Sequence, residues 1–309
     1  MPELPEVETF KRYLDNTSLH QRITTVEVCD AYVLKRVSAR ELVRRLKGRR
    51  FENSHRHGKH LLVRAGNELW LRLHFGMTGS LEYLNQHQEM PKTARVIFCF
   101  ANNRRLAFDD QRKFGEIELI EDVDEFVETR SLGPDALEIS FSQFEAITQK
   151  YRGAVKAILL NQQLIAGIGN LYADEILFRA RMHPGTEAAS LRDIDLTRLF
   201  RATRYVLEKE IALKADFNRL PKSWLLLHRG KRGRCPRCGR ALKSATIGGR
   251  TSWFCEHCQK RNAEPSERLA HSKPLRQSGA KTHRTSAADV LHHRPKTADN
   301  FLQSAGDLA

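Results

Sequence analysis

Residues 235–258 read CPRCGRALKSATIGGRTSWFCEHC, and they contain four of the six cysteines in the chain. The cysteines form two C-x2-C pairs, Cys235/Cys238 and Cys255/Cys258, with sixteen residues between the pairs. Each pair can turn two thiolates towards one ion, and this spacing is typical of a closed four-cysteine zinc site. We therefore predict one structural Zn²⁺ that holds a β-hairpin too small to have its own core.

The other two cysteines, Cys29 and Cys99, are expected to be small buried side chains. His257 lies between two predicted ligands and is not expected to bind the metal. The alternative for the two pairs is four free thiols or a redox pair.

The cysteine segment is also the most basic part of the chain. The 309 residues carry a net charge of +15, and the pI is about 9.8. Between residues 228 and 262, ten Lys or Arg accompany a single acid, Glu256. Such a surplus indicates a polyanionic partner, with nucleic acid the first candidate. A ribosome-associated basic protein is the alternative.

Upstream of this segment the apolar residues repeat with helical spacing. Four helices are predicted, at residues 142–150, 155–162, 171–181 and 195–213. The N-terminal part, to about residue 132, is instead β-rich after one short helix at residues 7–14. Gly133-Pro134-Asp135 breaks the pattern and is a candidate domain boundary. The predicted strands, which suggest a sandwich or barrel, are residues 60–64, 68–75, 95–100, 104–109 and 115–120.

The chain has no features of a membrane protein. Mean hydropathy is −0.52, and no run of eighteen apolar residues occurs. The N-terminus, MPELPE, lacks the basic flank and apolar run of a signal peptide. We expect a monomer in the bacterial cytoplasm, associated with the nucleoid while it works. Residues 263–309 have few aromatics, and we predict a disordered tail there.

Pro2 is a candidate nucleophile. Removal of Met1 would leave a secondary amine, and an α-amino group has a pKa of roughly 8, well below that of lysine. Part of it is therefore unprotonated at neutral pH and can attack a sugar C1′ to form an iminium ion. Glu3 could move protons beside it, and Glu6 could line the same pocket. The simpler alternative is an ordinary terminal proline.

Four motifs together resemble one family. In chain order they are Pro2–Glu8 (PELPEVE), His74–Leu81 (HFGMTGSL), Gly167–Glu175 (GIGNLYADE) and the four-cysteine segment. They resemble the formamidopyrimidine-DNA glycosylase / endonuclease VIII family, on the formamidopyrimidine side, over about residues 1–262. The resemblance implies a multidomain α+β protein. Its parts would be a catalytic β-sandwich (1–133), a helix–two-turn–helix DNA-binding domain (134–227), a zinc finger (228–262) and the tail (263–309).

The resemblance also implies catalytic residues. Pro2 would be the Schiff-base nucleophile and Glu3 the proton donor and shuttle. Lys59 matches a lysine that contacts phosphate beside the lesion and assists β-elimination. Arg250 matches the zinc-finger arginine that grips the phosphates flanking the extruded nucleotide and is linked to δ-elimination. From the residues alone, Lys59 could equally be a solvated lysine at a strand end.

Five DNA-binding residues are implied as well. Met77, Arg112 and Phe114 match the residues that fill the gap left by a flipped base. Asn170 matches a phosphate-binding asparagine, and its place at a helix start agrees with anion binding by free N–H groups. Lys156 matches a lysine of the DNA-facing helix. Taken singly, Met77 and Phe114 could be core residues, and Lys156 could simply face solvent.

The predicted function is base-excision repair. The chain would be a bifunctional glycosylase and abasic-site lyase that removes oxidised or ring-opened purines from damaged double-stranded DNA by β,δ-elimination. Some positions depart from the family: Gln111 replaces a proline, Thr93 replaces a histidine, and residues 216–234 form a shorter loop than the one that closes over 8-oxoguanine. The alternatives are an endonuclease VIII-like enzyme for oxidised pyrimidines or hydantoins, and a non-catalytic DNA-binding zinc protein.

Overall fold

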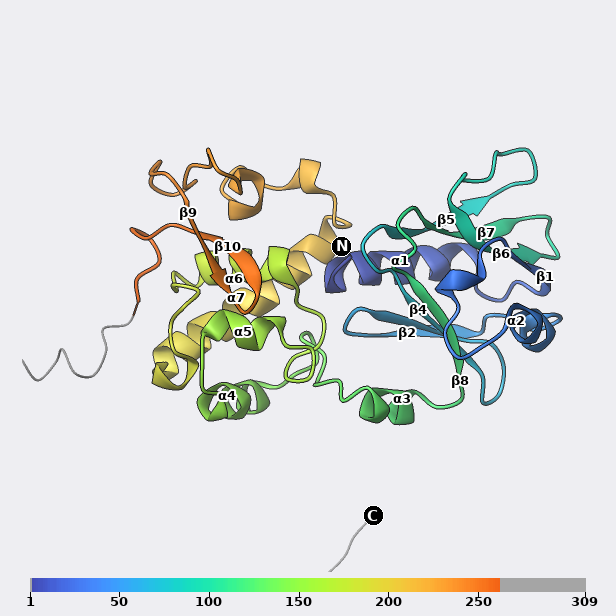
Figure 1. The fold of residues 1–309 in the computed structure, drawn as a ribbon, viewed down its shortest axis with the longest axis horizontal. Coiled ribbons are helices and arrows are strands. Elements are labelled where there is room, and N and C mark those ends of the chain that lie inside the picture. Colours follow the sequence, from blue (N-terminus) through green and yellow to red (C-terminus); the bar gives the residue numbers. More distant parts are fainter. Residues whose placement is uncertain (1, 262–309) are drawn as a thin grey trace, which may run out of the picture. The chain divides into compact units, whose positions relative to one another are not determined.

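The computed structural model describes residues 2–261, and the predicted tail at 263–309 lies outside this range. Its N-terminal part contains two four-stranded antiparallel sheets (Figure 1). One sheet has the order β1-β6-β7-β5 and the other β2-β3-β4-β8. The strands are β1 Ile23–Val28, β2 Asn53–His57, β3 His60–Arg64, β4 Trp70–His74, β5 Gly79–Leu84, β6 Ala94–Phe100, β7 Arg105–Asp110 and β8 Glu116–Ile120.

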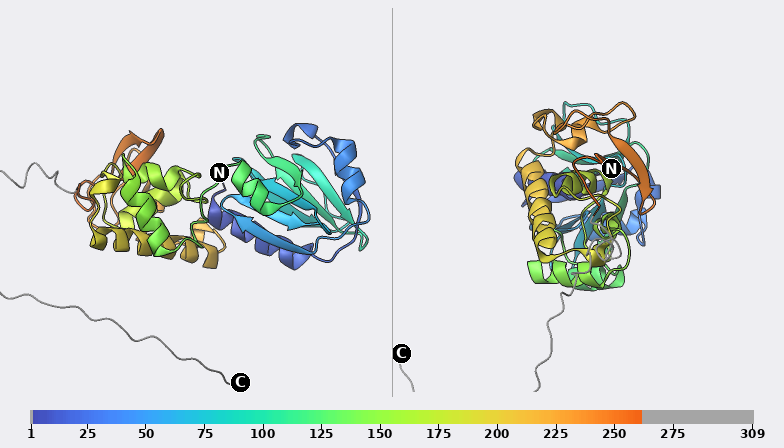
Figure 2. Two further views of the ribbon diagram at one scale, coloured as in Figure 1. Left: turned by 90° about the horizontal axis from the view of Figure 1, so that it is seen from below. Right: turned by 90° about the vertical axis from the view of Figure 1, so that its left-hand side faces the viewer.

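The two sheets bury their inner faces against each other. Leu61 and Val63 of β3 belong to the same buried cluster as Val96 and Phe98 of β6. These residues are two apart along each strand, so their side chains point to one face. Figure 2 shows the sheets as two layers of the N-terminal part. The predicted β-sandwich is therefore confirmed.

The same alternation explains why one prediction was wrong. Cys99 is only partly buried and Cys29 is exposed, whereas both were expected inside. Phe98 and Phe100 point into the sandwich, so Cys99 between them must point out. Cys29 follows the last residue of β1 and is outside the sheet.

The first helix, α1 (Leu4–Thr17), is longer than predicted because its start is capped. Glu3 is the N-cap, Pro5 lies in the first turn, and Glu3 and Glu6 form a reciprocal capping box. Helix α1 contacts the sandwich through β2, β3 and β5. The other helical elements of this part are η1 Ala31–Val33, α2 Ala39–Leu46 and α3 Val123–Thr129.

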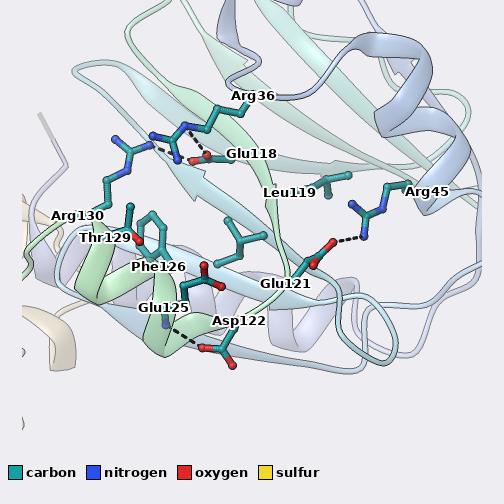
Figure 3. Close-up of a pocket in the computed structure, with 11 residues that line it drawn as sticks. Arg36, Arg45, Glu118, Leu119, Glu121, Asp122, Glu125, Phe126, Thr129 and Arg130 are labelled. Atoms are coloured by element: carbon teal, nitrogen blue, oxygen red, sulfur yellow. Dashed lines mark hydrogen bonds and ion pairs between the residues drawn. The ribbon is translucent and has the colours of Figure 1, made fainter.

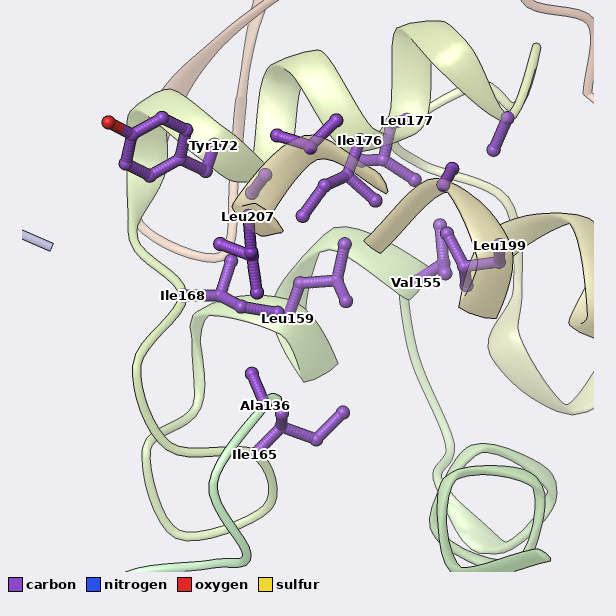
Figure 4. Close-up of a cluster of buried hydrophobic side chains, with 14 of the residues drawn as sticks. Ala136, Val155, Leu159, Ile165, Ile168, Tyr172, Ile176, Leu177, Leu199 and Leu207 are labelled. Carbon is purple, nitrogen blue, oxygen red and sulfur yellow. The ribbon is translucent and has the colours of Figure 1, made fainter. Parts of the chain in front are cut away.

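Four helices build the second part, as predicted. They are α4 Phe141–Lys150, α5 Val155–Leu160, α6 Asn170–Arg179 and α7 Asp193–Ala212, and the short turns η2 Ala188–Ser190, η3 Phe217–Arg219 and η4 Leu225–His228 accompany them. Their shared core includes Leu159, Ile176, Leu199 and Leu207 (Figure 4). Leu4 of α1 belongs to this core as well, so the start of the chain is anchored among the helices.

The cysteine segment forms the predicted hairpin. Strands β9 (Lys243–Ile247) and β10 (Arg250–Phe254) are joined by Gly248 and Gly249, which have φ angles of 59° and 71°. A two-residue turn with both φ angles positive favours glycine and places Arg250 directly opposite Ile247. Between residues 2 and 261, no helix combines the length and apolar character needed to cross a membrane.

A pocket of about 300 Å³ lies between β8 and α3 (Figure 3). Several of its charged side chains pair with one another: Glu118 bonds Arg130 at 3.1 Å and lies 3.6 Å from Arg36. Arg45 lies 3.5 Å from Glu121. None of the predicted site residues lines this pocket.

Candidate active site and zinc centre

Glu3 is held at the start of a helix that lies far from it in sequence. Its carboxylate accepts hydrogen bonds from the backbone N–H groups of Gly169 (2.7 Å), Leu171 (2.9 Å) and Tyr172 (3.3 Å). These groups form the first turn of α6, whose unpaired N–H groups favour an anion. A Cβ atom at position 169 would lie 2.3 Å from the Glu3 Cδ, so only glycine fits there.

Pro2 is partly buried, and the residues after it are fixed. The Glu3 N–H donates to Glu6 Oε2 at 2.9 Å, and the Tyr172 hydroxyl donates to Glu6 Oε1 at 2.7 Å. Glu6 therefore connects the peptide group that follows Pro2 to α6. Glu6 is half-buried and Tyr172 is fully buried, so neither is an ordinary surface residue.

The ionisable groups around Pro2 have shifted pKa values. Burial raises the pKa of Glu3, while the positive charge of Lys59 and the three N–H donors oppose the rise. Burial lowers the pKa of Lys59, which the Glu3 charge opposes and the Arg250 charge reinforces. Burial also raises the pKa of Glu6 to about 7. The charges of Glu3 and Arg250 thus both act on Lys59, and a carboxyl with a raised pKa suits proton transfer near neutral pH.

Lys59 lies in the turn between β2 and β3, and its side chain is buried. It is therefore not the solvated strand-end lysine that the sequence left possible. Asp135 fixes this turn: it accepts the Gly58 N–H at 2.7 Å and pairs with both terminal nitrogens of Arg56. Arg56 also bonds Glu8 of α1 at 3.2 Å. The candidate boundary at residues 133–135 thus carries the residue that positions Lys59.

Arg250 is exposed at the start of β10, and its hairpin is fastened to the helices. Asn170 donates to the Thr251 carbonyl oxygen at 3.2 Å. The Trp253 N–H donates to Asp174 Oδ2 at 3.1 Å, which also accepts from Arg229 at 3.0 Å. The side chain of Asn170, predicted to bind phosphate, here connects α6 to the strand that carries Arg250.

Lys156 lies neither on a DNA-facing surface nor in solvent. It is completely buried, and its Nζ donates to Asn170 Oδ1 (2.8 Å), Asp174 Oδ1 (2.6 Å) and Ser252 Oγ (2.7 Å). An ammonium group has three donors, and all three are used. Lys156 therefore joins α5, α6 and β10. The sequence around Lys156 could not predict these acceptors, because they lie 14, 18 and 96 positions away along the chain.

Met77, Arg112 and Phe114 lie together on two neighbouring loops of the sandwich. The side chain of Met77 is 41 % exposed and that of Phe114 50 % exposed, so neither is a core residue. The Arg112 guanidinium lies 4.9 Å from the centre of the Phe114 ring, and the backbone N–H of Arg112 donates to Thr78 Oγ1 at 3.0 Å. Exposed apolar side chains of this size beside an arginine are suited to insertion into a base stack.

The four cysteines fit a zinc ion. Their sulfur atoms all lie within 4.8 Å of one another. The Cys235–Cys258 and Cys238–Cys255 sulfurs are 3.8 and 3.6 Å apart. Four sulfurs at about 2.3 Å from a tetrahedral Zn²⁺ would be about 3.8 Å apart. The four-cysteine set is therefore a structural zinc site, and it leaves no ligand position open for catalysis.

The structure also brings in residues that were not predicted. They are Tyr172 and Asp174 in the first turns of α6, Ser252 and Arg229 around Lys156, and Arg56 and Asp135 behind Lys59. Tyr172 and Asp174 belong to the GIGNLYADE motif and could have been suspected from it. The others have no local signal, because their partners are far away in sequence.

The described residues form one architecture: a β-sandwich, a helical part in which the start of α6 binds the Glu3 carboxylate, and a four-cysteine hairpin. Three sequence models agree with it: the formamidopyrimidine-DNA glycosylase N-terminal domain at residues 1–117, its H2TH domain at 132–221, and the zinc finger found in FPG and IleRS at 233–261. The formamidopyrimidine-DNA glycosylase of Carboxydothermus hydrogenoformans is 36% identical over 278 residues, covering 84% of this chain and 100% of that protein.

Solved structures agree as well. A complex of Lactococcus lactis Fpg with DNA containing FAPY-dG has a TM-score of 0.76 and 28% identity. The same enzyme with abasic-site DNA has a TM-score of 0.75 and 28% identity. Both comparisons cover 84% of this chain and 100% of the other. The chain belongs to the formamidopyrimidine-DNA glycosylase family.

Proposed function

We propose that this protein is a base-excision repair DNA glycosylase with lyase activity at abasic sites, and that Pro2 is its nucleophile. The observation that carries the proposal is the group of residues around Pro2. A buried carboxyl held by three N–H groups, a buried lysine of lowered pKa and an exposed arginine act on one another beside the first residues of the chain. The family's activity, glycosylase and abasic-site lyase, needs this combination of an amine and a proton shuttle.

The reaction begins with the free Pro2 amine, after Met1 has been removed. Its lone pair forms a bond to C1′, the bond between C1′ and the base breaks with its electron pair on the base, and the base takes up a proton. The amine loses its own proton, the C1′–O4′ bond opens, and O4′ is protonated to give the iminium ion. Glu3 is the group placed to give and take these protons.

Elimination completes the reaction. The iminium ion acidifies C2′, and loss of a C2′ proton expels the 3′ phosphate in β-elimination. Loss of a C4′ proton then expels the 5′ phosphate in δ-elimination. We assign the flanking phosphates to Lys59 and Arg250, and Asn170 to a phosphate near the start of α6. Met77, Arg112 and Phe114 fill the space of the extruded nucleotide.

The preferred lesions are oxidised or ring-opened purines. The support is the structural likeness to an enzyme solved with FAPY-dG in its DNA. The short segment between α7 and Cys235 contains only η3 and η4. An endonuclease VIII-like preference for oxidised pyrimidines or hydantoins is the second candidate, because this segment offers less to cover an 8-oxopurine. We further propose that the protein acts as a monomer on double-stranded DNA in the bacterial cytoplasm.

Borohydride trapping tests the proposal. Duplexes that contain an abasic site, ring-opened guanine, 8-oxoguanine or an oxidised pyrimidine are mixed with the protein and reduced, and the crosslinked peptide is mapped. We expect an adduct on Pro2 in the abasic lane, with the strongest lesion lane among the purines. One glycine inserted before Pro2 should abolish it, whereas one glycine inserted into the β3–β4 turn after Asn67 should not. An adduct on a lysine, or none, would contradict the role of Pro2.

A further inference from the structure

Glu210 is a buried acid that the proposed mechanism does not use. It lies near the end of α7, and its side chain has no exposed surface. Neither of its carboxyl oxygens has a hydrogen-bond partner in the part of the chain that the structure describes. The other buried acids are paired: Asp174 with Lys156, Glu175 with Arg179, and Glu3 with three N–H groups. A buried charge without such a partner is costly, so Glu210 is stable only as the neutral acid.

The charged groups around Glu210 reinforce this state. Helix α1 contributes Glu3 and Glu6, and α6 contributes Glu175 and the neutral Tyr172. Among the described residues, the charges that shift Glu210 come from Glu6, Glu175 and Glu3, and all three are negative. Burial first, and then these acids, raise the pKa of Glu210 to about 8. Glu6, its neighbour on α1, has a pKa of about 7 for the same main reason.

These acids connect α7 to the candidate nucleophile. Helix α7 packs against α1, and Leu4 of α1 shares a core with Val206 and Ile211 of α7. Glu6 holds the Glu3 N–H and the Tyr172 hydroxyl, as described above. Figure 4 shows Tyr172 with its hydroxyl pointing away from the aliphatic side chains of the helical core. The peptide N–H that follows Pro2 is therefore hydrogen-bonded to Glu6, and the charge of Glu6 acts on Glu210.

We propose that Glu210 is a positioning residue for the Pro2 amine, and that the reaction requires its carboxyl group to stay neutral. An ionised Glu210 repels Glu6 and weakens the bond from Glu6 to the Glu3 N–H, which loosens the first turn of α1. The added negative charge also favours the protonated amine, which is not a nucleophile. Both effects reduce the rate as pH rises. This inference rests on the proposed role of Pro2.

The direction of this effect separates it from the titration of the amine. An amine nucleophile alone becomes more reactive with rising pH until it is fully deprotonated. Ionisation of Glu210 instead lowers the reaction rate as pH rises. Its pKa is higher in the folded than in the unfolded protein, so the folded protein holds an extra proton between about pH 4.5 and 8 and loses stability as pH rises through that window. The same loss should appear in thermal unfolding.

The experiment compares pH profiles. Single-turnover borohydride trapping on an abasic duplex is measured from pH 6 to 10, and each rate is divided by that protein's rate at pH 7. The proteins are the wild type, Glu210→Gln, which mimics the neutral acid, and the control Glu208→Gln, which changes an exposed residue of α7. We expect the relative rate of wild type and control to fall below that of Glu210→Gln by up to tenfold for each pH unit above about 8. The melting temperature should fall less with pH for Glu210→Gln than for the other two.

Each outcome bears on the inference. Parallel pH profiles for the three proteins overturn it, and so does a Glu210→Gln protein that melts with the same pH dependence as the wild type. If Glu210→Gln does not fold, Glu210→Met is the second neutral replacement, and failure of both shows that a neutral side chain is not what the site requires. If the wild type gives no adduct at any pH, the role of Pro2 fails and the inference with it, whereas the melting curves still report the state of Glu210.

Discussion

Individual residues in this protein have roles that their sequence neighbours do not reveal, and Lys156 is the best example. The family resemblance implied DNA contact for Lys156, and its sequence alone was consistent with solvent exposure. Instead, its ammonium group is buried among Asn170, Asp174 and Ser252, which come from two other elements. It couples the zinc hairpin to the helices through Ser252 of β10, the strand that begins with Arg250.

We predict that Lys156→Met destabilises the protein by about 3 kcal/mol. Loss of one partner from a buried ion pair leaves the other charge uncompensated, which typically costs 3–5 kcal/mol, and Arg229 still offsets part of the charge on Asp174. The measurement is the free energy of unfolding in urea. Lys150→Met, an exposed change on α4, should cost less than about 0.5 kcal/mol.

The salt dependence of DNA binding distinguishes this role from a phosphate contact. Removal of a lysine that binds phosphate reduces the slope of log K against log salt by about one. We expect no such change for Lys156→Met, because its three donors are occupied within the protein. A reduced slope together with unchanged stability would mean that Lys156 contacts DNA after all.

At the scale of elements, the β9–β10 hairpin depends on a bound zinc ion for its stability. Strands β9 and β10 have five residues each, and most side chains of β9 are exposed. The small cluster beneath them contains Phe178, Leu225 and Leu242 together with the cysteines themselves. Such an element cannot fold on apolar burial alone, so the metal must supply the remainder.

We predict that Cys255→Ser removes the bound zinc and, with it, the action of Arg250. Zinc content should fall from one ion per chain to nearly none, and δ-elimination products should decrease at least tenfold. The Schiff base on Pro2 should still form, because Glu3 is held by α6 and not by the hairpin. Zinc analysis and product separation on an abasic duplex check this. Cys29→Ser, outside the metal site, should keep both zinc and products, and a full zinc content in Cys255→Ser would contradict the assignment.

The helices and strands were the part of the structure that the sequence predicted best. Strand β3 was predicted at residues 60–64 as observed, and α4 to α7 differ by only a few residues at their ends, because each has clear periodicity and a turn signal at its ends. Strands β1, β2 and β5 were not predicted. Strand β2, NSHRH, is polar along its whole length and is kept in the sheet by pairing with β3. Its side chains bond distant residues, Ser54 with Asp15 and Arg56 with Asp135, and local β-propensity does not report such partners.

The residues of the site were predictable to a similar degree. The family resemblance pointed to Pro2, Glu3, Lys59, Asn170 and Arg250, and the structure connects the last four through hydrogen bonds and charges. The residues behind them were not predictable. Asp135, for example, meets Arg56 across 79 positions of sequence, and neither residue carries a local pattern.

At the scale of the whole molecule, the Arg56–Asp135 pair is the clearest connection between the sandwich and the segment that leads to the helices. Asp135 accepts the Gly58 N–H and the Leu137 N–H in addition to Arg56, and it is fully buried. Through Gly58 it fixes the turn that presents Lys59. One carboxylate therefore contributes both to stability and to the geometry of the candidate site.

We predict that Asp135→Asn lowers stability by roughly 3 kcal/mol and slows trapping on abasic DNA at least tenfold. The amide has no charge to balance Arg56 and cannot accept on both of its terminal atoms. The measurements are urea unfolding and single-turnover trapping at pH 7. Glu138→Gln, an exposed change three residues away, is the control. Slower trapping without lost stability would place Asp135 in DNA binding, and lost stability with normal trapping would show that the Lys59 turn does not depend on it.

The bonds from Glu3 to the start of α6 have a consequence for synthesis of the protein. They join residues 166, 168 and 169 positions apart. A ribosome adds about 5–20 residues per second, so on the order of ten seconds or more pass between the emergence of Pro2 and that of its partners. During that interval the N-terminal segment is an unassembled peptide end with an ordinary amine. The Glu3 site therefore forms only when translation has passed Tyr172 and the two distant segments have met.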